Sequence, residues 1–169
     1  IHPLTIPASM PNAPVGHISL EFDLRGPSYA ISTACASSNH AITDAFRSIQ
    51  RGEASVIITG GTEETMQPLA IAGFLKLKAL SLRNDEPEKA SRPFERDRDG
   101  FVMGEGSGVI ILEEREHALR RGARIYAEIV GAGMTSDAYH IVAPNPEGIG
   151  AAKCMEAALK DAGIPPEEI

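Results

Sequence analysis

Residues 26–40 read GPSYAISTACASSNH, and the pattern changes within this stretch at Cys35. Before the cysteine, residues 29–34 form a short run of small and β-branched side chains, which is typical of a β-strand. After it, apolar side chains recur at the spacing of one helix face, at Ile42, Ala45, Phe46 and Ile49. The sequence therefore predicts a strand, the cysteine and then a helix over about residues 36–50, which ends near Gly52 because glycine readily takes the left-handed cap conformation.

The rest of the chain repeats this alternation of strands and helices. Residues 54–59 form a continuous apolar run before two glycines, which is typical of a strand buried on both faces of a mostly parallel sheet. The stretch up to Pro14 contains four prolines and is expected to be irregular. Further strands are expected at 101–103, 108–112 and 125–130, helical turns at 68–80, and helices at 113–121 and 149–162. The predicted fold class is α/β.

Composition and charge exclude several classes of function. The chain has 169 residues, of which 43% are hydrophobic and 23% charged, as in an ordinary globular domain. Its net charge is −7, and no stretch concentrates lysine and arginine, so neither nucleic acid nor an anionic membrane surface is an expected partner. The longest apolar runs are far shorter than the roughly 20 residues that a membrane-spanning helix needs.

Metal and nucleotide cofactors are not expected either. The two cysteines lie far apart, and no Cys-x-x-Cys or His-x-x-x-His spacing predicts a metal site or a disulfide framework. The glycine-rich residues 104–108 precede a predicted strand, whereas a dinucleotide-binding loop follows a strand and opens a helix. We therefore expect no bound cofactor, and a reducing compartment is the default interpretation.

Cys35 is the candidate for chemistry. At a junction between a strand and a helix, its sulfur would lie near unpaired backbone N–H groups, which stabilise a thiolate and the oxyanion of a tetrahedral intermediate. The flanking residues are small and leave room for an acyl group, an arrangement that parallels a nucleophile elbow. The alternative is that Cys35 is a small buried hydrophobic residue, which is the more common role of a lone cysteine.

Two long motifs carry a resemblance to a known family. Residues 26–40 strongly resemble the active-site segment of β-ketoacyl-acyl-carrier-protein synthases, and residues 91–108, SRPFERDRDGFVMGEGSG, resemble that family's other long signature at matching separation. Shorter matches at 57–63 and 136–140 follow in order, so the likeness covers essentially the entire chain. It looks closest to the elongating, type II-like branch.

The resemblance implies a thiolase-like, layered α-β-α-β-α fold that is incomplete in this chain. Residues 1–122 would be the later part of the N-terminal half, and residues 123–169 the start of the C-terminal half. Members of this family are homodimers that receive acyl and malonyl groups from acyl carrier protein and extend the acyl chain by decarboxylative Claisen condensation. A bacterial cytoplasm is the expected location, with a plastid or mitochondrion as alternatives.

The resemblance also assigns roles to individual residues. Cys35 would be the acyl-accepting nucleophile, with its own backbone N–H as one oxyanion donor. Phe74 would line the acyl pocket and Lys78 would contact the carrier protein, although core packing and a solvated lysine explain these two residues equally well. Asp137 and His140 would belong to a loop beside the active site that supports its architecture more than proton transfer, with a plain surface role as the alternative for the aspartate.

Other parts of the family's machinery are missing from the sequence. The motifs that carry the second oxyanion donor and the two catalytic histidines do not occur in it. The chain begins at Ile1 without an initiator methionine and stops just beyond a predicted helix. We therefore expect an internal piece of a longer enzyme that by itself has no turnover.

Three other interpretations stay open at this point. A polyketide ketosynthase or a starter-unit condensing enzyme would share the cysteine and differ in the shape of the pocket. A chain-length factor would keep the fold but lose the nucleophile, which the retained Cys35 argues against. The piece could also be inert, because it would expose sheet edges and helix faces that other segments normally cover.

Overall fold

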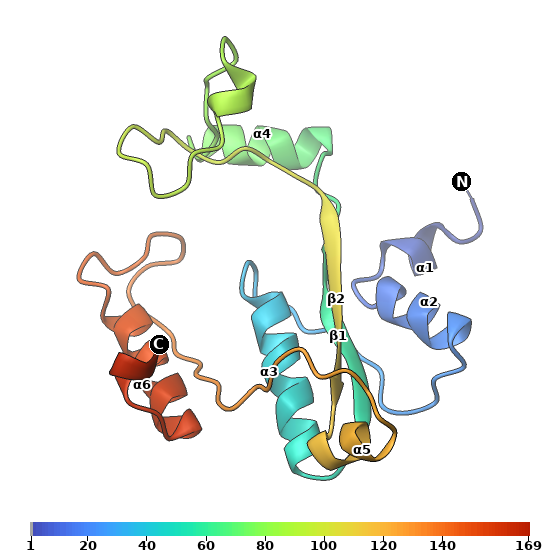
Figure 1. The fold of residues 1–169 in the computed structure, drawn as a ribbon. Coiled ribbons are helices and arrows are strands. Elements are labelled where there is room, and N and C mark those ends of the chain that lie inside the picture. The colour runs from blue at the N-terminus through green and yellow to red at the C-terminus, as the bar shows by residue number, and fades with distance from the viewer. Residues whose placement is uncertain (1) are drawn as a thin grey trace. The chain divides into compact units, whose positions relative to one another are not determined.

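The computed structural model describes residues 2–169, in which two strands are interspersed among helices (Figure 1). No helix in this described part is long and apolar enough to cross a membrane. In chain order the α-helices, β-strands and 3-10 helices (η) are α1 (Thr5–Ser9), α2 (Ala13–Glu21), α3 (Ser37–Gln50), β1 (Val56–Glu63), α4 (Pro68–Lys76), η1 (Pro87–Lys89), β2 (Gly106–Glu113), α5 (Arg115–Arg120), α6 (Ile149–Ala162) and η2 (Pro166–Glu168).

The chain forms two compact units. The first combines residues 1–59 with residues 110–169, and the second consists of residues 60–109. Cys35 and the Asp137–His140 loop belong to the first unit, and Phe74 and Lys78 belong to the second.

The predicted helices of the first unit are confirmed, together with the residues that end them. Helix α3 ends next to Gly52, which has a φ of +73°, and α6 ends at Gly163 with a φ of +69°. Helix α5 begins where the Glu114 side chain accepts hydrogen bonds from two backbone N–H groups, and Gly122 follows it with a φ of +67°. Since only glycine adopts these angles without steric cost, the cap positions could be read from the sequence.

Strand β1 has an antiparallel partner, not the parallel neighbours that its apolar sequence suggested. It pairs with β2 in a two-stranded sheet. Ser55 accepts a hydrogen bond of 2.9 Å from the Glu114 N–H, and Gly60 lies against Gly108, so residue numbers rise along one strand as they fall along the other. Within β1 only Thr59 is buried, so the prediction of a strand buried on both faces is wrong for the described chain.

Four other predictions of local structure are also wrong. Residues 29–34 and 125–130 form no strand, and Phe101 makes only an isolated bridge to Leu80. A strand requires a neighbour that is hydrogen-bonded along its length, and the described residues supply no more than isolated bridges at Thr33 and Phe101 for these segments. The segment before Pro14, expected to be irregular, contains α1 and the start of α2; proline is compatible with the first helical turn because the N–H that it lacks would be unpaired there anyway.

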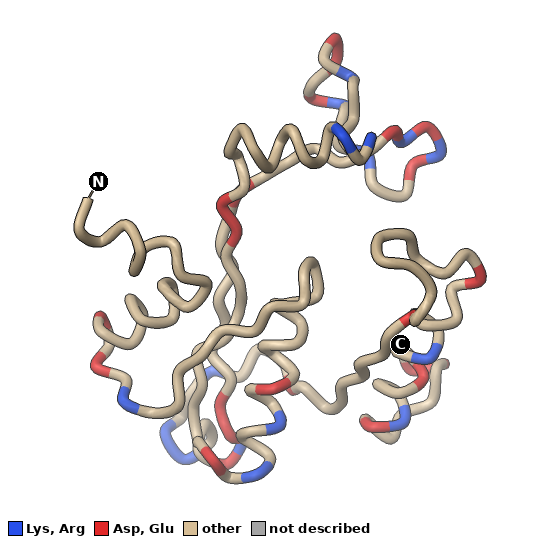
Figure 2. The backbone as a smooth tube through the Cα atoms, turned by 180° about the vertical axis from the view of Figure 1, so that it is seen from behind, with Lys and Arg blue, Asp and Glu red and all other residues tan. Residues whose placement is uncertain are grey.

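The second unit consists of α4 and a long charged loop that is tied together by polar contacts. The Asp99 carboxylate accepts hydrogen bonds from the Ser81 hydroxyl at 2.7 Å and from the Leu82 N–H at 3.2 Å, and these bonds, with that of Ser81 foremost, lower its pKa. The Arg83 guanidinium lies 3.4 Å from the same carboxylate. Figure 2 shows acidic and basic residues interspersed along this loop. Side chains thus hold a segment that has little regular structure.

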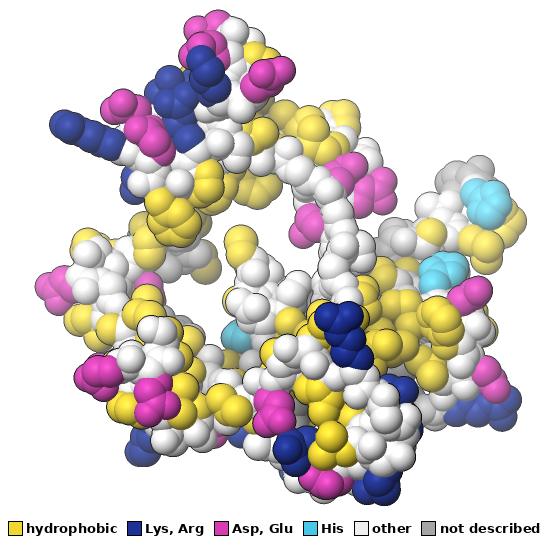
Figure 3. All heavy atoms as spheres, in the orientation of Figure 1, with side chains coloured by type: hydrophobic (Ala, Val, Ile, Leu, Met, Phe, Trp, Pro, Cys, Tyr) yellow, Lys and Arg dark blue, Asp and Glu magenta, His cyan; other side chains and the backbone are white. Residues whose placement is uncertain are grey.

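Much of the apolar surface is open. Within residues 2–169 the buried hydrophobic residues are three alanines, Ala45, Ala90 and Ala118. Large apolar side chains such as Leu69 and Phe94 are 87% and 99% exposed, and Figure 3 shows hydrophobic side chains spread over the visible face. Because monomeric soluble proteins rarely expose so much contiguous apolar surface, these faces are suited to being covered by further protein.

Candidate functional site

Cys35 lies at the N-terminal end of α3, with its thiol exposed to solvent. Ala36 is the N-cap residue and the helix begins at Ser37. Among the described residues, the backbone N–H groups of Cys35, Ser38 and Asn39 donate no hydrogen bond within the protein. The site therefore places an accessible sulfur beside unpaired donors, where the helix dipole also favours negative charge.

A tight turn precedes the helix and leaves these donors free. Ala34 has a φ of +50°, in the left-handed region that costs an alanine about 1 kcal/mol. The N–H groups of Ala36 and Ser37 donate to the carbonyls of Thr33 and Ala34, each at 3.1 Å. The predicted junction at Cys35 is thus half confirmed: the helix follows as expected, and a turn stands where the strand was expected to end.

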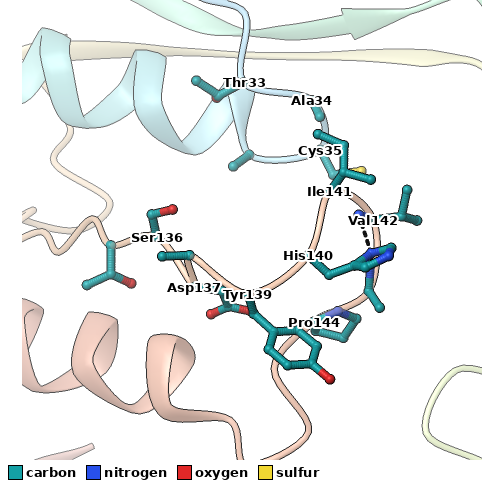
Figure 4. Close-up of a pocket in the computed structure, with 14 residues that line it drawn as sticks. Thr33, Ala34, Cys35, Ser136, Asp137, Tyr139, His140, Ile141, Val142 and Pro144 are labelled. Atoms are coloured by element: carbon teal, nitrogen blue, oxygen red, sulfur yellow. Dashed lines mark hydrogen bonds between the residues drawn. The ribbon is translucent and has the colours of Figure 1, made fainter.

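Cys35 borders an open hollow of about 950 Å³ in the first unit. One wall is formed by residues 33–36, and the other by residues 135–144 (Figure 4). Asp137 and His140 lie on this second wall, across the hollow from Cys35. Cys35 thus lies near Asp137 and His140, which follow it about a hundred positions later in the chain. These are three of the five residues selected from the sequence.

His140 shapes the loop through its ring. Its Nδ1 accepts hydrogen bonds from the backbone N–H groups of Val142 and Ala143, both at 3.0 Å. A nitrogen that accepts two such bonds carries no proton, so the proton of the neutral ring is on Nε2. Through this nitrogen the ring thus bonds the backbone of its own loop.

Asp137 and Thr135 attach the same loop to the start of α6. The Asp137 carboxylate accepts a hydrogen bond from the Asn145 N–H at 2.9 Å, and the Thr135 hydroxyl donates to the Gly150 carbonyl at 2.7 Å. A Cβ atom at Gly150 would stand 1.8 Å from Asp137 Oδ1, so no side chain fits there while Asp137 keeps its position. The sequence did not single out Thr135 or Gly150, because the importance of each depends on a distance that the sequence does not give.

The segment before the loop packs on the backbone of α6. The Cys154 thiol donates to the Gly133 carbonyl at 3.2 Å. At the other end of α6, Asp161 accepts bonds from the Ala132 N–H at 2.8 Å and from the Arg47 guanidinium at 2.6 Å. The bond from Arg47, with that from Ala132 second, lowers the pKa of Asp161. Because Arg47 is on α3, this cluster ties the helix that presents Cys35 to the helix that holds the opposite wall.

Phe74 and Lys78 belong to the unit formed by residues 60–109. Phe74 is on α4 and is 37% exposed. Lys78 follows the end of α4 with a φ of +55°, and its side chain is exposed. A cation at the C-terminus of a helix interacts favourably with the helix dipole, so Lys78 has a structural explanation besides a contact with a partner.

Models of two protein domains match the chain. The beta-ketoacyl synthase N-terminal domain matches residues 1–118, and the corresponding C-terminal domain matches residues 126–169. Together the two matches cover nearly the whole sequence.

Individual proteins agree with these matches. The 3-oxoacyl-[acyl-carrier-protein] synthase 2 of Vibrio cholerae is 52% identical over the full chain, which covers 41% of that protein. The mitochondrial 3-oxoacyl-[acyl-carrier-protein] synthase of Arabidopsis thaliana is 51% identical, with 37% of it covered. A chain from the structure of a type II polyketide acyl carrier protein in complex with its ketosynthase superposes with a TM-score of 0.88 at 37% identity, over 94% of this chain and 39% of that one. The chain thus spans about two fifths of the length of the relatives that it matches.

Proposed function

The chain belongs to the β-ketoacyl synthase family, and we propose that the protein containing it is an elongating 3-oxoacyl-acyl-carrier-protein synthase. The family resemblance of the two long motifs is confirmed, and the chain has part of the thiolase-like ketosynthase fold. The level of identity favours fatty-acid elongation, since synthases of that kind are 52% and 51% identical, against 37% for the polyketide ketosynthase complex.

In the proposed reaction Cys35 accepts the growing acyl chain. Its thiolate attacks the thioester carbonyl of acyl carrier protein, and the tetrahedral intermediate collapses with release of the carrier's thiol and formation of an acyl-Cys35 thioester. Malonyl carrier protein then loses CO2, and the resulting carbanion attacks the acyl carbonyl. The new carbon–carbon bond forms as the Cys35 sulfur leaves, and the product is a β-ketoacyl chain two carbons longer on the carrier.

The observation that carries this proposal is the exposed Cys35 thiol, with a free backbone N–H, at the start of α3. A free N–H of the nucleophile's own residue can donate to the oxyanion that develops in each attack on a carbonyl. The unpaired N–H groups of the first helical turn add a favourable field for the same charge.

We assign supporting roles to the other four residues selected from the sequence. Asp137 and His140 would hold the wall opposite Cys35, which their bonds to Asn145 and to the backbone beyond His140 support. Phe74 would line the acyl pocket, and its partial exposure leaves a face to contact a ligand. Lys78 would meet the acidic carrier protein, which its exposure at the end of α4 supports.

The whole protein is proposed to be a homodimer that works on acyl and malonyl carrier protein. Residues 1–122 would belong to its N-terminal half and 123–169 would begin its C-terminal half, in line with the separate matches to the two domain models. The location would be a bacterial cytoplasm, or an organelle such as that of the mitochondrial relative. The isolated chain would have no turnover, since it lacks the family's histidine motifs.

Covalent labelling of the full-length protein tests the proposal. With radiolabelled acyl carrier protein as donor, we expect one acyl group per subunit, located at Cys35 by peptide mass spectrometry. Cys35→Ala should abolish the adduct, and Cys154→Ala, which removes the other thiol, should keep it. Labelling at Cys154, or none at all, would refute the assignment.

A further inference from the structure

We propose that Ser37 is a positioning residue for the nucleophile: its hydroxyl closes the turn around Cys35 so that the Cys35 N–H stays free to bind the oxyanion. This inference rests on the proposed acylation of Cys35. It concerns a residue two positions after the nucleophile, whose hydroxyl lies within the turn and not in the hollow's lining.

The Ser37 hydroxyl connects both ends of the turn. It accepts a hydrogen bond from the Thr33 N–H at 2.8 Å and donates one to the Ala34 carbonyl at 2.7 Å. With the two backbone bonds of Ala36 and Ser37, the turn thus has four hydrogen bonds across five residues. Cys35 lies in the middle and takes part in none of them as a donor.

Removal of this hydroxyl favours a rearrangement of the turn. The Thr33 N–H would lose its partner, and Ala34 would keep its unfavourable left-handed φ of +50° with one bond fewer to hold it. Returning Ala34 to a negative φ requires the peptide planes on both sides of its Cα to turn, and the second of these planes joins Ala34 to Cys35. Since that peptide carries the Cys35 N–H, the oxyanion donor would change direction.

Ser38 provides a matched control. It is the next residue of the same helical turn, carries the same side chain and is exposed. Within residues 2–169 its hydroxyl makes no hydrogen bond. Ser38→Ala therefore makes the same change in side chain and in helix propensity, but it leaves the hydrogen bonds of the turn in place.

The experiment compares two reactions of Cys35 in the full-length protein. Acylation by acyl carrier protein develops an oxyanion, whereas alkylation by iodoacetamide needs only an accessible thiolate. We expect Ser37→Ala to slow acylation by about a hundredfold, which is the scale of a small misplacement of a catalytic group, and to leave alkylation within about twofold of the wild type. Ser38→Ala should change neither rate, and Ser37→Thr, which keeps the hydroxyl, should restore acylation.

The outcomes separate this inference from the proposed function. Equal acylation by Ser37→Ala and Ser38→Ala, or an equal loss of acylation and alkylation, would overturn the role of Ser37 while acylation of wild-type Cys35 stands. Failure of wild-type Cys35 to acylate would overturn both. If Ser37→Ala does not fold, Ser37→Val and Ser37→Thr give the same comparison, because they share a shape and differ in the hydroxyl.

Discussion

The packing of Gly133 on α6 leads to a prediction that can be worked out from distances. A Cβ atom at position 133 would stand 2.2 Å from the Cys154 carbonyl oxygen and 2.8 Å from the Ala158 nitrogen. Both are backbone atoms inside a helix, so neither can turn aside as a flexible side chain would. Gly133→Ala therefore forces α6 and the segment before the loop apart by about 1 Å, since ordinary contacts of a Cβ atom begin at 3.4 Å.

The expected loss in the free energy of unfolding lies at the upper end of the range for overpacked sites. Inserting a methyl group into a well-packed site costs about 1–3 kcal/mol, and a clash with backbone favours the larger value. A relative of which this chain covers 41% is about 400 residues long. At about 2.1 cal/mol/K of unfolding entropy per residue, a loss of about 3 kcal/mol lowers the melting temperature of a protein of that length by about 3–4 °C. The bond from the Cys154 thiol to the Gly133 carbonyl would be lengthened as well.

Thermal unfolding of the full-length protein, followed by circular dichroism, measures this effect. Gly16→Ala is the control, because Gly16 is inside α2 with open space around it in this chain, and alanine there should raise stability by about 0.5–1 kcal/mol. A Gly133→Ala protein that melts at the wild-type temperature would show that the segment does not pack on α6 as described.

Three further predictions concern single side chains. His140→Asn should keep acylation of Cys35 near the wild-type rate in the labelling assay, because the amide oxygen can replace Nδ1 as acceptor, whereas His140→Ala should slow it. Hydrogen bonds from Arg121 first and His117 second lower the pKa of Glu113 from 4.5 to about 2. The stability that this carboxylate contributes is therefore present above pH 4.5 and is lost as the pH falls toward 2. The difference in melting temperature between wild type and Glu113→Gln should accordingly shrink below pH 4.5. Lys78→Asn removes the charge while tolerating a positive φ, and it should raise the KM for acyl carrier protein at low salt without lowering kcat; an unchanged KM would leave Lys78 with a structural role only.

The helices could be predicted from the sequence because their signals are local. Apolar spacing and a following glycine are enough to place α3 and α6 within a residue or two of their observed ends. The strands at 29–34 and 125–130 could not be judged in the same way, because a strand depends on a partner that its own sequence does not specify. The antiparallel pairing of β1 was hidden for the same reason: an apolar run indicates burial and not the direction of the neighbour.

The sequence could point to candidate residues of the site, but not to the contacts that hold these residues in place. Cys35, Asp137 and His140 could be selected from motif resemblance, and the structure places them around one hollow. Ser37 and Gly150 could not, because their importance depends on distances: a hydroxyl that reaches two backbone groups across the turn, and a carboxylate oxygen that occupies the space of a missing Cβ. Supports of this kind become visible only when segments distant in sequence are seen together.

Different contacts hold the two ends of α6, the helix against which the wall opposite Cys35 rests. Their loss should therefore change the site in different ways. At the C-terminal end of α6, an ion pair between Arg47 and Asp161 fixes it to α3, with side chains that are 33% and 29% exposed. At its N-terminal end, Gly150 leaves only enough room for the Asp137 carboxylate. Loss of the ion pair should let α6 shift relative to α3 while the loop itself stays intact. A Cβ atom at position 150 should instead turn the Asp137 carboxylate aside, at the expense of its bond to the Asn145 N–H, and leave the two helices in register. The first change would alter the distance between the walls, and the second only the wall that faces Cys35.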